Sequence, residues 1–299
     1  TLIESHTQSG GCAGTFKRKR YIFDVGATQV AGLEEGGIHS KIFKFLDIPL
    51  PEASILNPAC IVDLKDGSKP IPIWYDKDEW IKEREMQFPG SRQFWQLCNL
   101  IHQSNWTFAN NNPVLPVKNF WDFSQLLKAL VPTNLVTGIL IKSTIFDLLR
   151  FCGLSNDERL IKFLNLQLKL YSQEDVYNTA ALYGSTVLQM CQKPHGLWHL
   201  KKSMQALSDA LEDSLKKRGV NIVFGQKVNS INFDYVKKSW KVCASSKLEK
   251  MVYFADDVIY TPPPQSLLKH LKSPLDNNYN YKKRIQSLPD PSGALVFYS

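Results

Sequence analysis

The 299-residue chain changes character twice along its length, and this alternation limits its possible folds more than any other feature. Residues 1 to 58 combine short β-rich runs with a glycine loop, and residues 200 to 264 hold a helix followed by several strands. Amphipathic helices dominate residues 60 to 200. Helices that alternate with strands are typical of α/β folds. We therefore expect an α/β domain that is interrupted by a helix-rich insertion.

Two segments show the local signals clearly. Leu207, Leu211 and Leu215 recur at helical spacing, and Gly219 occupies the position where a glycine ends a helix. The residues that follow, 220 to 234, read as strands. Within the insertion, a helix is expected from residue 92 with Ser91 as its N-cap.

Composition and charge limit the partners. The net charge is +8 and 43% of the residues are hydrophobic, which is ordinary for a folded chain. A basic balance suits nucleic acid, an anionic membrane surface or an anionic cofactor. The densest basic cluster, residues 17 to 20, is not interleaved with the aromatic residues on which single strands stack, so we expect no nucleic-acid partner. The most apolar run, residues 134 to 149, is shorter than the roughly 20 residues of a membrane-spanning helix.

The cysteines and histidines do not form a metal-binding pattern. The chain has six cysteines and no C-x-x-C pair, which favours free thiols in a reducing compartment. His195 and His199 are four residues apart, but Pro194 and Gly196 argue against a helix that would place both rings on one face. We expect no metal site.

The opening stretch, TLIESHTQSGGCAGTF, has the chemistry of a nucleotide-binding segment. A short strand ends at Glu4, and an acid in this position can accept hydrogen bonds from ribose hydroxyls. Gly10 and Gly11 would let the backbone approach a phosphate without a Cβ in the way. No complete G-x-G-x-x-G occurs in the 299 residues. We therefore expect a fragment, truncated at both ends, whose first strand and phosphate loop would precede Thr1.

Several segments resemble the flavoproteins of the phytoene desaturase and carotenoid isomerase family, and within it the cyanobacterial carotenoid 3',4'-desaturases. The resemblance covers nearly the whole chain. It rests on LIESHTQSGGCAGTFKRKRYIFDVGATQVAGLE, NPAC, FPGSRQFWQL, LQLKLYSQ and GLWHLKKSMQALSDALEDSLKKRGVNI.

The resemblance implies an α/β fold with a discontinuous, Rossmann-like FAD-binding domain of the amine-oxidase type and an inserted α+β substrate or cap domain. The FAD-binding domain would comprise residues 1–58 and 200–264. The substrate and membrane-associating domain would comprise residues 59–199 and 265–299.

The same resemblance implies the cofactor, FAD, and its contacts. Glu4 would hold the adenosine ribose, and Gly10 and Gly11 would lie beside the pyrophosphate, with the loop leading through Thr15 under the flavin. Asp24 would be a structural hydrogen-bonding residue. The remaining contacts would be Gly26 and Ala27 at the isoalloxazine and Val228 at the adenine, through its backbone.

The implied substrate is an apolar carotenoid, and the implied reaction is the FAD-dependent desaturation of a carbon–carbon bond in the polyene. No catalytic residue is assigned. The substrate-lining candidates are Gln29, Gln167 and Tyr171, although each of them also fits an ordinary core or helix-surface position. The aromatic and basic residues of segment 119–152 would bind a membrane surface, or the segment would be a buried cap helix. A peripheral enzyme on the cytoplasmic side of a thylakoid or plasma membrane is expected.

Two other readings stay open. The same scaffold would serve a redox-neutral carotenoid cis–trans isomerase, or a degenerate carotenoid-binding protein without turnover. The second of these is favoured by Lys202, which stands where the family pattern usually has a glycine close to the flavin. In the family geometry, the Lys202 side chain must point away from the flavin or neutralise its charge.

Overall fold

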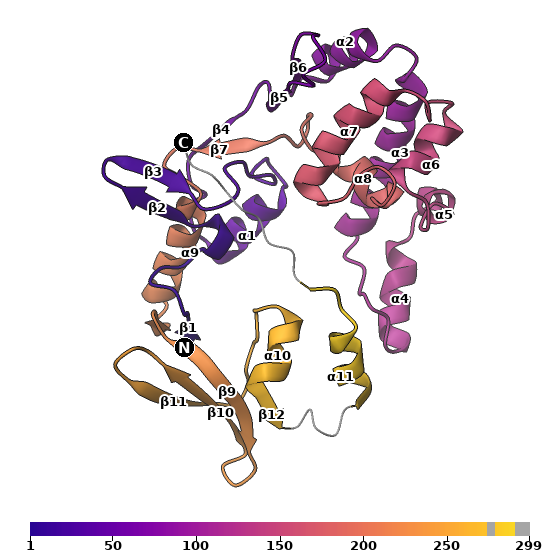
Figure 1. The fold of residues 1–299 in the computed structure, drawn as a ribbon. Coiled ribbons are helices and arrows are strands. Elements are labelled where there is room, and N and C mark those ends of the chain that lie inside the picture. Colours follow the sequence, from indigo (N-terminus) through magenta and orange to yellow (C-terminus); the bar gives the residue numbers. More distant parts are fainter. Residues whose placement is uncertain (274–278, 291–299) are drawn as a thin grey trace. The chain divides into compact units, whose positions relative to one another are not determined.

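A computed structural model describes residues 1–273 and 279–290, and Figure 1 shows its course. The chain divides into two compact units. The first unit comprises Thr1–Thr28, Leu46–Glu52 and the described chain from Leu200 onward. The second unit comprises Gln29–Phe45 and Ala53–His199. Each unit is therefore built from segments that are far apart in the sequence.

The first unit is a mixed α/β structure. Its elements are β1 (Leu2–Ile3), η1 (Gly11–Ala13), β2 (Thr15–Arg18), β3 (Tyr21–Asp24), α9 (Gln205–Lys217), β8 (Ile222–Val223), β9 (Lys227–Asp234), β10 (Ser239–Ser245), β11 (Lys250–Ala255), α10 (Pro264–His270), β12 (Leu271–Ser273) and α11 (Tyr279–Gln286). Strand β1 pairs in parallel with β8, and β2 with β3 in an antiparallel hairpin. The largest sheet has the order β11-β10-β9-β12, with β12 parallel to β9.

Local sequence signals explain the elements of the first unit. Helix α9 ends as expected at Gly219, which has φ +75°, and the amide of Val220 donates to the carbonyl of Leu215 over 3.0 Å. In the sheet, Ile231 of β9 stands opposite Val242 of β10. Both side chains are buried, so one face of this sheet contributes apolar residues to the core.

The second unit is mainly helical. Its elements are α1 (Ile38–Leu46, whose last residue is assigned to the first unit), β4 (Ala53–Ile55), β5 (Cys60–Val62), β6 (Ile71–Ile73), α2 (Lys77–Gln87), α3 (Arg92–Asn110), α4 (Phe120–Ala129), α5 (Pro132–Gly138), α6 (Ile145–Phe151), α7 (Glu158–Tyr171), α8 (Ala181–Val187) and β7 (Trp198–Leu200, likewise ending in the first unit). Strand β5 pairs with β6, and β4 with β7, in two small sheets.

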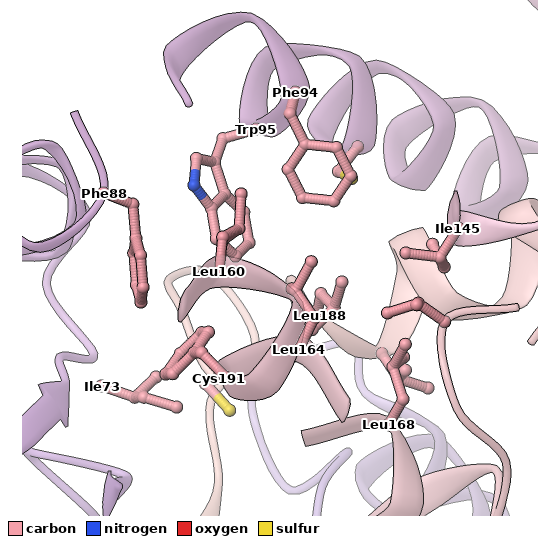
Figure 2. Close-up of a cluster of buried hydrophobic side chains, with 14 of the residues drawn as sticks. Ile73, Phe88, Phe94, Trp95, Ile145, Leu160, Leu164, Leu168, Leu188 and Cys191 are labelled. Carbon is pink, nitrogen blue, oxygen red and sulfur yellow. The ribbon is translucent and has the colours of Figure 1, made fainter. Parts of the chain in front are cut away.

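Helices α3, α6, α7 and α8 enclose the main core of the second unit (Figure 2). Phe94 and Trp95 of α3 and Leu164 of α7 are at most 1% exposed. Phe88 and Phe163 hold their ring centroids 4.9 Å apart, which is within the range of favourable aromatic pairs. Bulky side chains from four helices thus fill a single interior, and this fixes the helices against one another.

Side-chain caps begin several of these helices, but Ser91 is not one of them. The Asp157 carboxylate accepts the amide of Leu160 over 2.9 Å at the start of α7, as the sequence pattern predicts. The expectation of a Ser91 cap is wrong. The Ser91 hydroxyl instead donates to the carbonyl of Phe88 over 2.6 Å and accepts the indole N–H of Trp95 over 3.1 Å. The buried indole needs a hydrogen-bond acceptor, and this need directs the Ser91 side chain inward.

Two segments group differently from the predicted domain boundaries. Residues 29–45 belong to the second unit rather than with the rest of segment 1–58. The described part of segment 265–299 belongs to the first unit, because β12 pairs with β9. Residues 291–299 lie outside the described residues. Backbone pairing between distant segments sets these boundaries, and one-dimensional periodicity does not report it.

Within the described ranges, no helix has both the length and the apolar composition needed to cross a membrane. The apolar run of residues 134–149 is divided between α5 and α6.

Candidate functional site

Glu4 lies directly after β1, where this strand runs parallel to β8. Its amide donates to the carbonyl of Val223 over 2.9 Å, and its carbonyl accepts the amide of Gln226 over 3.0 Å. The Glu4 side chain is half-buried, and its Oε1 accepts the amide of His6 over 2.6 Å. Its Oε2 has no hydrogen-bond partner among the described residues. One carboxylate oxygen thus holds the turn, and the other remains available to a ligand.

The glycine loop that follows lies against the start of α9. Gly10 has φ +110°, and a Cβ at this position would lie 3.0 Å from Ser208 Oγ and 3.1 Å from Gly14 Cα. Gly11 has φ +52°, and a Cβ there would meet no atom within 4 Å. The loop therefore presses Gly10 against the protein and leaves Gly11 with an open face. This arrangement gives a ligand direct access to the backbone.

Gln205, the first residue of α9, holds this loop in place. Its Oε1 accepts the amide of Thr15 over 3.2 Å, and its Nε2 donates to the carbonyl of Ser9 over 3.0 Å. Its Nε2 also donates to Asp209 Oδ1 over 3.1 Å, which orients the amide group. A single side chain on the helix thus joins both ends of the glycine loop.

Asp24 and Thr15 complete the start of α9. Asp24 Oδ1 accepts the amide of Met204 over 3.1 Å and the hydroxyl of Thr15 over 3.0 Å. The Thr15 hydroxyl in turn accepts the amide of Gln205 over 3.3 Å. Asp24 therefore forms structural hydrogen bonds at a helix N-terminus, as predicted. Thr15 is buried and hydrogen-bonded to protein groups, so its contact with the cofactor stays a prediction.

Gly26, Ala27 and Val228 also belong to the first unit. Gly26 and Ala27 are exposed, and a Cβ on Gly26 would lie 3.0 Å from the carbonyl oxygen of Cys12 in the glycine loop. Val228 follows Gln226 by two residues, next to an irregularity in the β9–β10 register. Because the amide of Gln226 donates to the carbonyl of Glu4, Val228 lies near the predicted ribose acid. The seven predicted cofactor residues thus gather in one unit, and their individual contacts stay predictions.

Lys202 is exposed in the segment before α9. The neighbouring Lys201 Nζ binds Glu52 Oε2 over 2.7 Å, and this hydrogen bond is the main reason why the pKa of Glu52 is lowered, with Lys202 adding a smaller electrostatic effect. The Lys202 side chain therefore lies on the solvent side of the first unit, next to a carboxylate.

In the second unit, the three predicted substrate-lining residues surround Cys60. Gln29 Nε2 donates to the carbonyl of Ala59 over 2.8 Å, and Gln167, which is 6% exposed, hydrogen-bonds the Cys60 thiol. Tyr171 interacts with Cys60 and hydrogen-bonds Cys191. The fold thus brings together residues that are separated by more than a hundred positions in the sequence. Their role as a substrate lining stays a prediction.

Burial keeps this cluster uncharged. It raises the pKa of the Cys191 thiol to about 12, and it raises the pKa of the Tyr171 phenol well above its usual value. Burial also raises the pKa of Cys60, against the hydrogen bond from Gln167 that lowers it. At neutral pH the cluster therefore offers neutral polar groups in an apolar interior.

The two histidines considered as metal ligands do not share a helix face. His195 lies in a loop, and His199 is an exposed residue of strand β7. Among the described residues, no group of three or more His, Cys, Asp or Glu side chains is placed to hold a metal ion. His195 instead forms an ion pair with Glu34 over 3.0 Å in a pocket of the second unit. The sequence analysis missed this pocket, for which the i, i+4 spacing of His102 and Trp106 on α3 was the available signal.

The first unit has the features of a nucleotide-type cofactor site: a strand-end acid with a free oxygen and a glycine loop with an open backbone face at a helix N-terminus. These residues fit the adenosine and pyrophosphate portion of FAD. The sequence profile of the flavin containing amine oxidoreductases matches residues 1–297, and the chain belongs to this family. Its cofactor is accordingly a flavin, FAD. The search of curated proteins finds no match.

Comparison with solved structures supports the amine-oxidase-like fold. A protein from Pyrococcus furiosus aligns with a TM-score of 0.61 at 14% identity, over 96% of this chain and 59% of that one. An oxidoreductase from Methanosarcina mazei gives 0.58 at 16% identity, over 96% and 59%. A fatty acid isomerase from P. acnes, which produces CLA, gives 0.54 at 15% identity, over 95% and 57%. The chain thus spans less than two thirds of the length of these structures.

Proposed function

We propose that the protein is an FAD-dependent carotenoid desaturase, which removes two hydrogens from a carbon–carbon bond of a polyene. The observation that carries this proposal is the uncharged polar cluster of Gln29, Gln167 and Tyr171 within the apolar second unit of a flavin-dependent enzyme family. The resemblance of several segments to carotenoid desaturases supports the same substrate class. An uncharged cluster suits an apolar chain, since it exposes no buried charge to that chain.

The proposed roles of the residues follow from their positions. The bound flavin would accept the two electrons that leave the carbon–carbon bond. Glu4 Oε2 would accept hydrogen bonds from the ribose, and the open face at Gly11 would admit the pyrophosphate. Gln167 and Tyr171 would orient the polyene, and their neutral state would avoid the cost of burying a charge next to it.

The proposal includes a membrane-surface location, on the cytoplasmic side of a thylakoid or plasma membrane, because a carotenoid partitions into the bilayer. Helices α4 and α5 of the second unit support it. Phe120 is 86% exposed and Trp121 is 62% exposed on α4, and Leu135 on α5 is 70% exposed. Apolar and aromatic side chains of this kind enter the interface between lipid headgroups and acyl chains.

A redox-neutral carotenoid cis–trans isomerase is the second candidate. The observation that favours it is the fold likeness to the fatty acid isomerase from P. acnes, a protein that by its name isomerises an apolar chain. The two candidates differ in whether electrons leave the substrate for good.

The mass of the product separates these candidates. The full-length protein would be purified, its flavin content read from its absorption spectrum, and the holoprotein incubated with a carotenoid in vesicles together with a quinone as electron acceptor. A desaturase yields a product lighter by two hydrogens, whereas an isomerase yields one of equal mass and altered retention. A flavin-containing protein that converts none of the carotenoids tested would count against both, and would favour a binding protein without turnover.

Paired variants test the cluster. Gln167→Leu should lower the turnover of the carotenoid by about tenfold, because one oriented polar contact is lost, and should leave the flavin spectrum unchanged. Gln103→Leu, at an exposed position of the same unit, is the matched control and should keep full turnover. Equal turnover in both variants would remove the cluster from the substrate site.

A further inference from the structure

A pocket of about 540 Å³ lies entirely within the second unit, and no residue of the flavin site takes part in it. Helix α3 forms one wall with His102 and Trp106, and the segment before β7 forms another with Gln189, Gln192 and His195. Glu34, from the loop before α1, also lines the pocket. The volume is large enough for a small molecule.

Three rings form one side of this pocket. The centroids of Trp106 and His195 are 4.5 Å apart, those of His102 and His195 are 5.2 Å apart, and those of His102 and Trp106 are 5.7 Å apart. Such a set of rings offers a planar ligand both a flat surface and ring edges for contact.

Several buried polar atoms of the pocket have no hydrogen-bond partner. His102 is 6% exposed and Gln189 is 8% exposed, and their Nδ1 and Nε2 atoms are unpaired. Gln192, which is 2% exposed, uses its Nε2 on the carbonyl of Trp74 over 3.1 Å and leaves Oε1 unpaired. Buried polar atoms without partners are rare and costly, so each of them requires an explanation.

Glu34 has the same property and carries a charge. Its Oε1 contacts His195 Nδ1 over 3.0 Å, and both side chains are 12% exposed. The second oxygen, Oε2, is buried and unpaired. A carboxylate oxygen in this environment needs a hydrogen-bond donor. Of the two lysines that line the pocket, Lys77 is exposed, and Lys193 binds Asp76 over 3.2 Å.

We propose that this pocket binds a small, planar, uncharged molecule with an N–H donor pair beside a hydrogen-bond acceptor, as in a primary carboxamide or the amino edge of a heterocycle. The donors satisfy Glu34 Oε2 and Gln192 Oε1, and the acceptor satisfies Gln189 Nε2. The ring lies against Trp106 and the two histidines. The proposal is independent of the reaction at the flavin.

Other ligand classes fit the pocket less well. A carboxylate or a quinone carries acceptors only, and would leave Glu34 Oε2 and Gln192 Oε1 without a donor. A carboxylate would also be repelled by the Glu34 carboxylate. A metal ion is disfavoured, since the described residues contain no suitable group of three ligands.

The donor requirement is tested with three probes that share one ring. Isothermal titration of the full-length holoprotein would compare benzamide, which has the N–H donors, with acetophenone and benzoate, which lack them. Benzamide should bind about tenfold more tightly than acetophenone, since two buried acceptors gain donors, and benzoate should bind least tightly. Equal affinity for benzamide and acetophenone, or no measurable binding of benzamide, would overturn the proposal.

A pair of variants locates the binding. Gln189→Met keeps the size of the side chain and removes an unpaired donor, so the protein should fold with unchanged or higher stability and bind benzamide about tenfold less tightly. Gln103→Met, at an exposed position of the same pocket, is the control and should bind as the unaltered protein does. If both variants bind benzamide with unchanged affinity, the ligand lies elsewhere and the proposal is wrong. Thermal unfolding of each variant verifies that it is folded.

Discussion

Gly10 and Gly11 differ in what surrounds them, although both have left-handed backbone angles. A Cβ on Gly10 would approach Ser208 and Gly14 to about 3 Å, whereas a Cβ on Gly11 would face open space. We expect Gly10→Ala to lower the free energy of unfolding by about 2 kcal/mol, and Gly11→Ala by about 1 kcal/mol, because only the first adds a clash to the backbone strain. Urea unfolding of the two variants measures this difference. Equal losses would mean that the loop is not held against α9 as described.

Glu4 is the residue whose loss should act most directly on the cofactor. Glu4→Gln keeps an oxygen for the amide of His6 but removes the charge that strengthens hydrogen bonds to a ribose. We expect the dissociation constant of FAD in the full-length protein to rise by about tenfold. Fluorescence titration of the apoprotein with FAD provides the measurement. Glu249→Gln, an exposed change in the same unit, should have no effect, and retention of full affinity by Glu4→Gln would remove Glu4 from the site.

His102 should make the stability depend on pH. Burial, and then the charges of His195 and Lys77, lower the pKa of His102 to about 4, whereas an unfolded histidine has a pKa of about 6.5. The unfolded state therefore binds more protons between these values, and stability falls as the pH decreases from about 6.5 to about 4. The groups that face His102 are His195 with its partner Glu34, and Lys77.

The test compares urea midpoints across this pH range. His102→Gln should lose less stability on acidification than the unaltered protein, because it lacks this titration. His199→Gln, which changes an exposed histidine of the same unit, should follow the unaltered protein. Parallel pH profiles for all three proteins would show that His102 is not held in its neutral form.

At the scale of elements, α4 is the helix whose exposed surface calls for an explanation. Phe120 and Trp121 stand at its start, and Leu127 on the same helix is 53% exposed. If α4 enters a membrane interface, replacing its aromatic residues with serine should remove much of the binding energy.

We expect the double variant Phe120→Ser, Trp121→Ser to float with vesicles of phosphatidylcholine and phosphatidylglycerol at a severalfold lower fraction than the unaltered protein. Phe45→Ser is the matched control, because Phe45 on α1 is 88% exposed but lies outside the α4–α5 region. Circular dichroism verifies that the variants are folded. A similar reduction in the control would indicate general hydrophobic adsorption rather than binding through α4.

At the scale of the whole molecule, the cofactor should be a major source of stability. FAD that binds the folded state alone stabilises it by mass action, by about 2.7 kcal/mol when its free concentration is a hundred times its dissociation constant. The urea midpoint of the full-length protein should therefore rise with added FAD. The rise should be smaller in Glu4→Gln at the same FAD concentration, and an unchanged midpoint would contradict specific binding to the folded state.

Several elements and contacts were predictable from local sequence. The leucine spacing and Gly219 predict α9, Asp157 predicts the start of α7, and the strand–acid–glycine pattern predicts the cofactor side of the first unit. Ser91 shows the limit of such signals, because its hydroxyl bonds the indole of Trp95 rather than the helix amides. A buried donor elsewhere in the fold can thus override a local preference.

The amino-acid sequence alone determined the helices and strands, the family resemblance, and the presence of a glycine loop after an acid, because these depend on spacing and on backbone preference. The tertiary structure alone decided that residues 29–45 join the second unit, that Gln29, Gln167 and Tyr171 meet around Cys60, and that Glu34 and His195 share a pocket with His102. These groupings join segments more than a hundred residues apart. Long-range packing and the pairing of buried polar groups select them, and no local pattern encodes either.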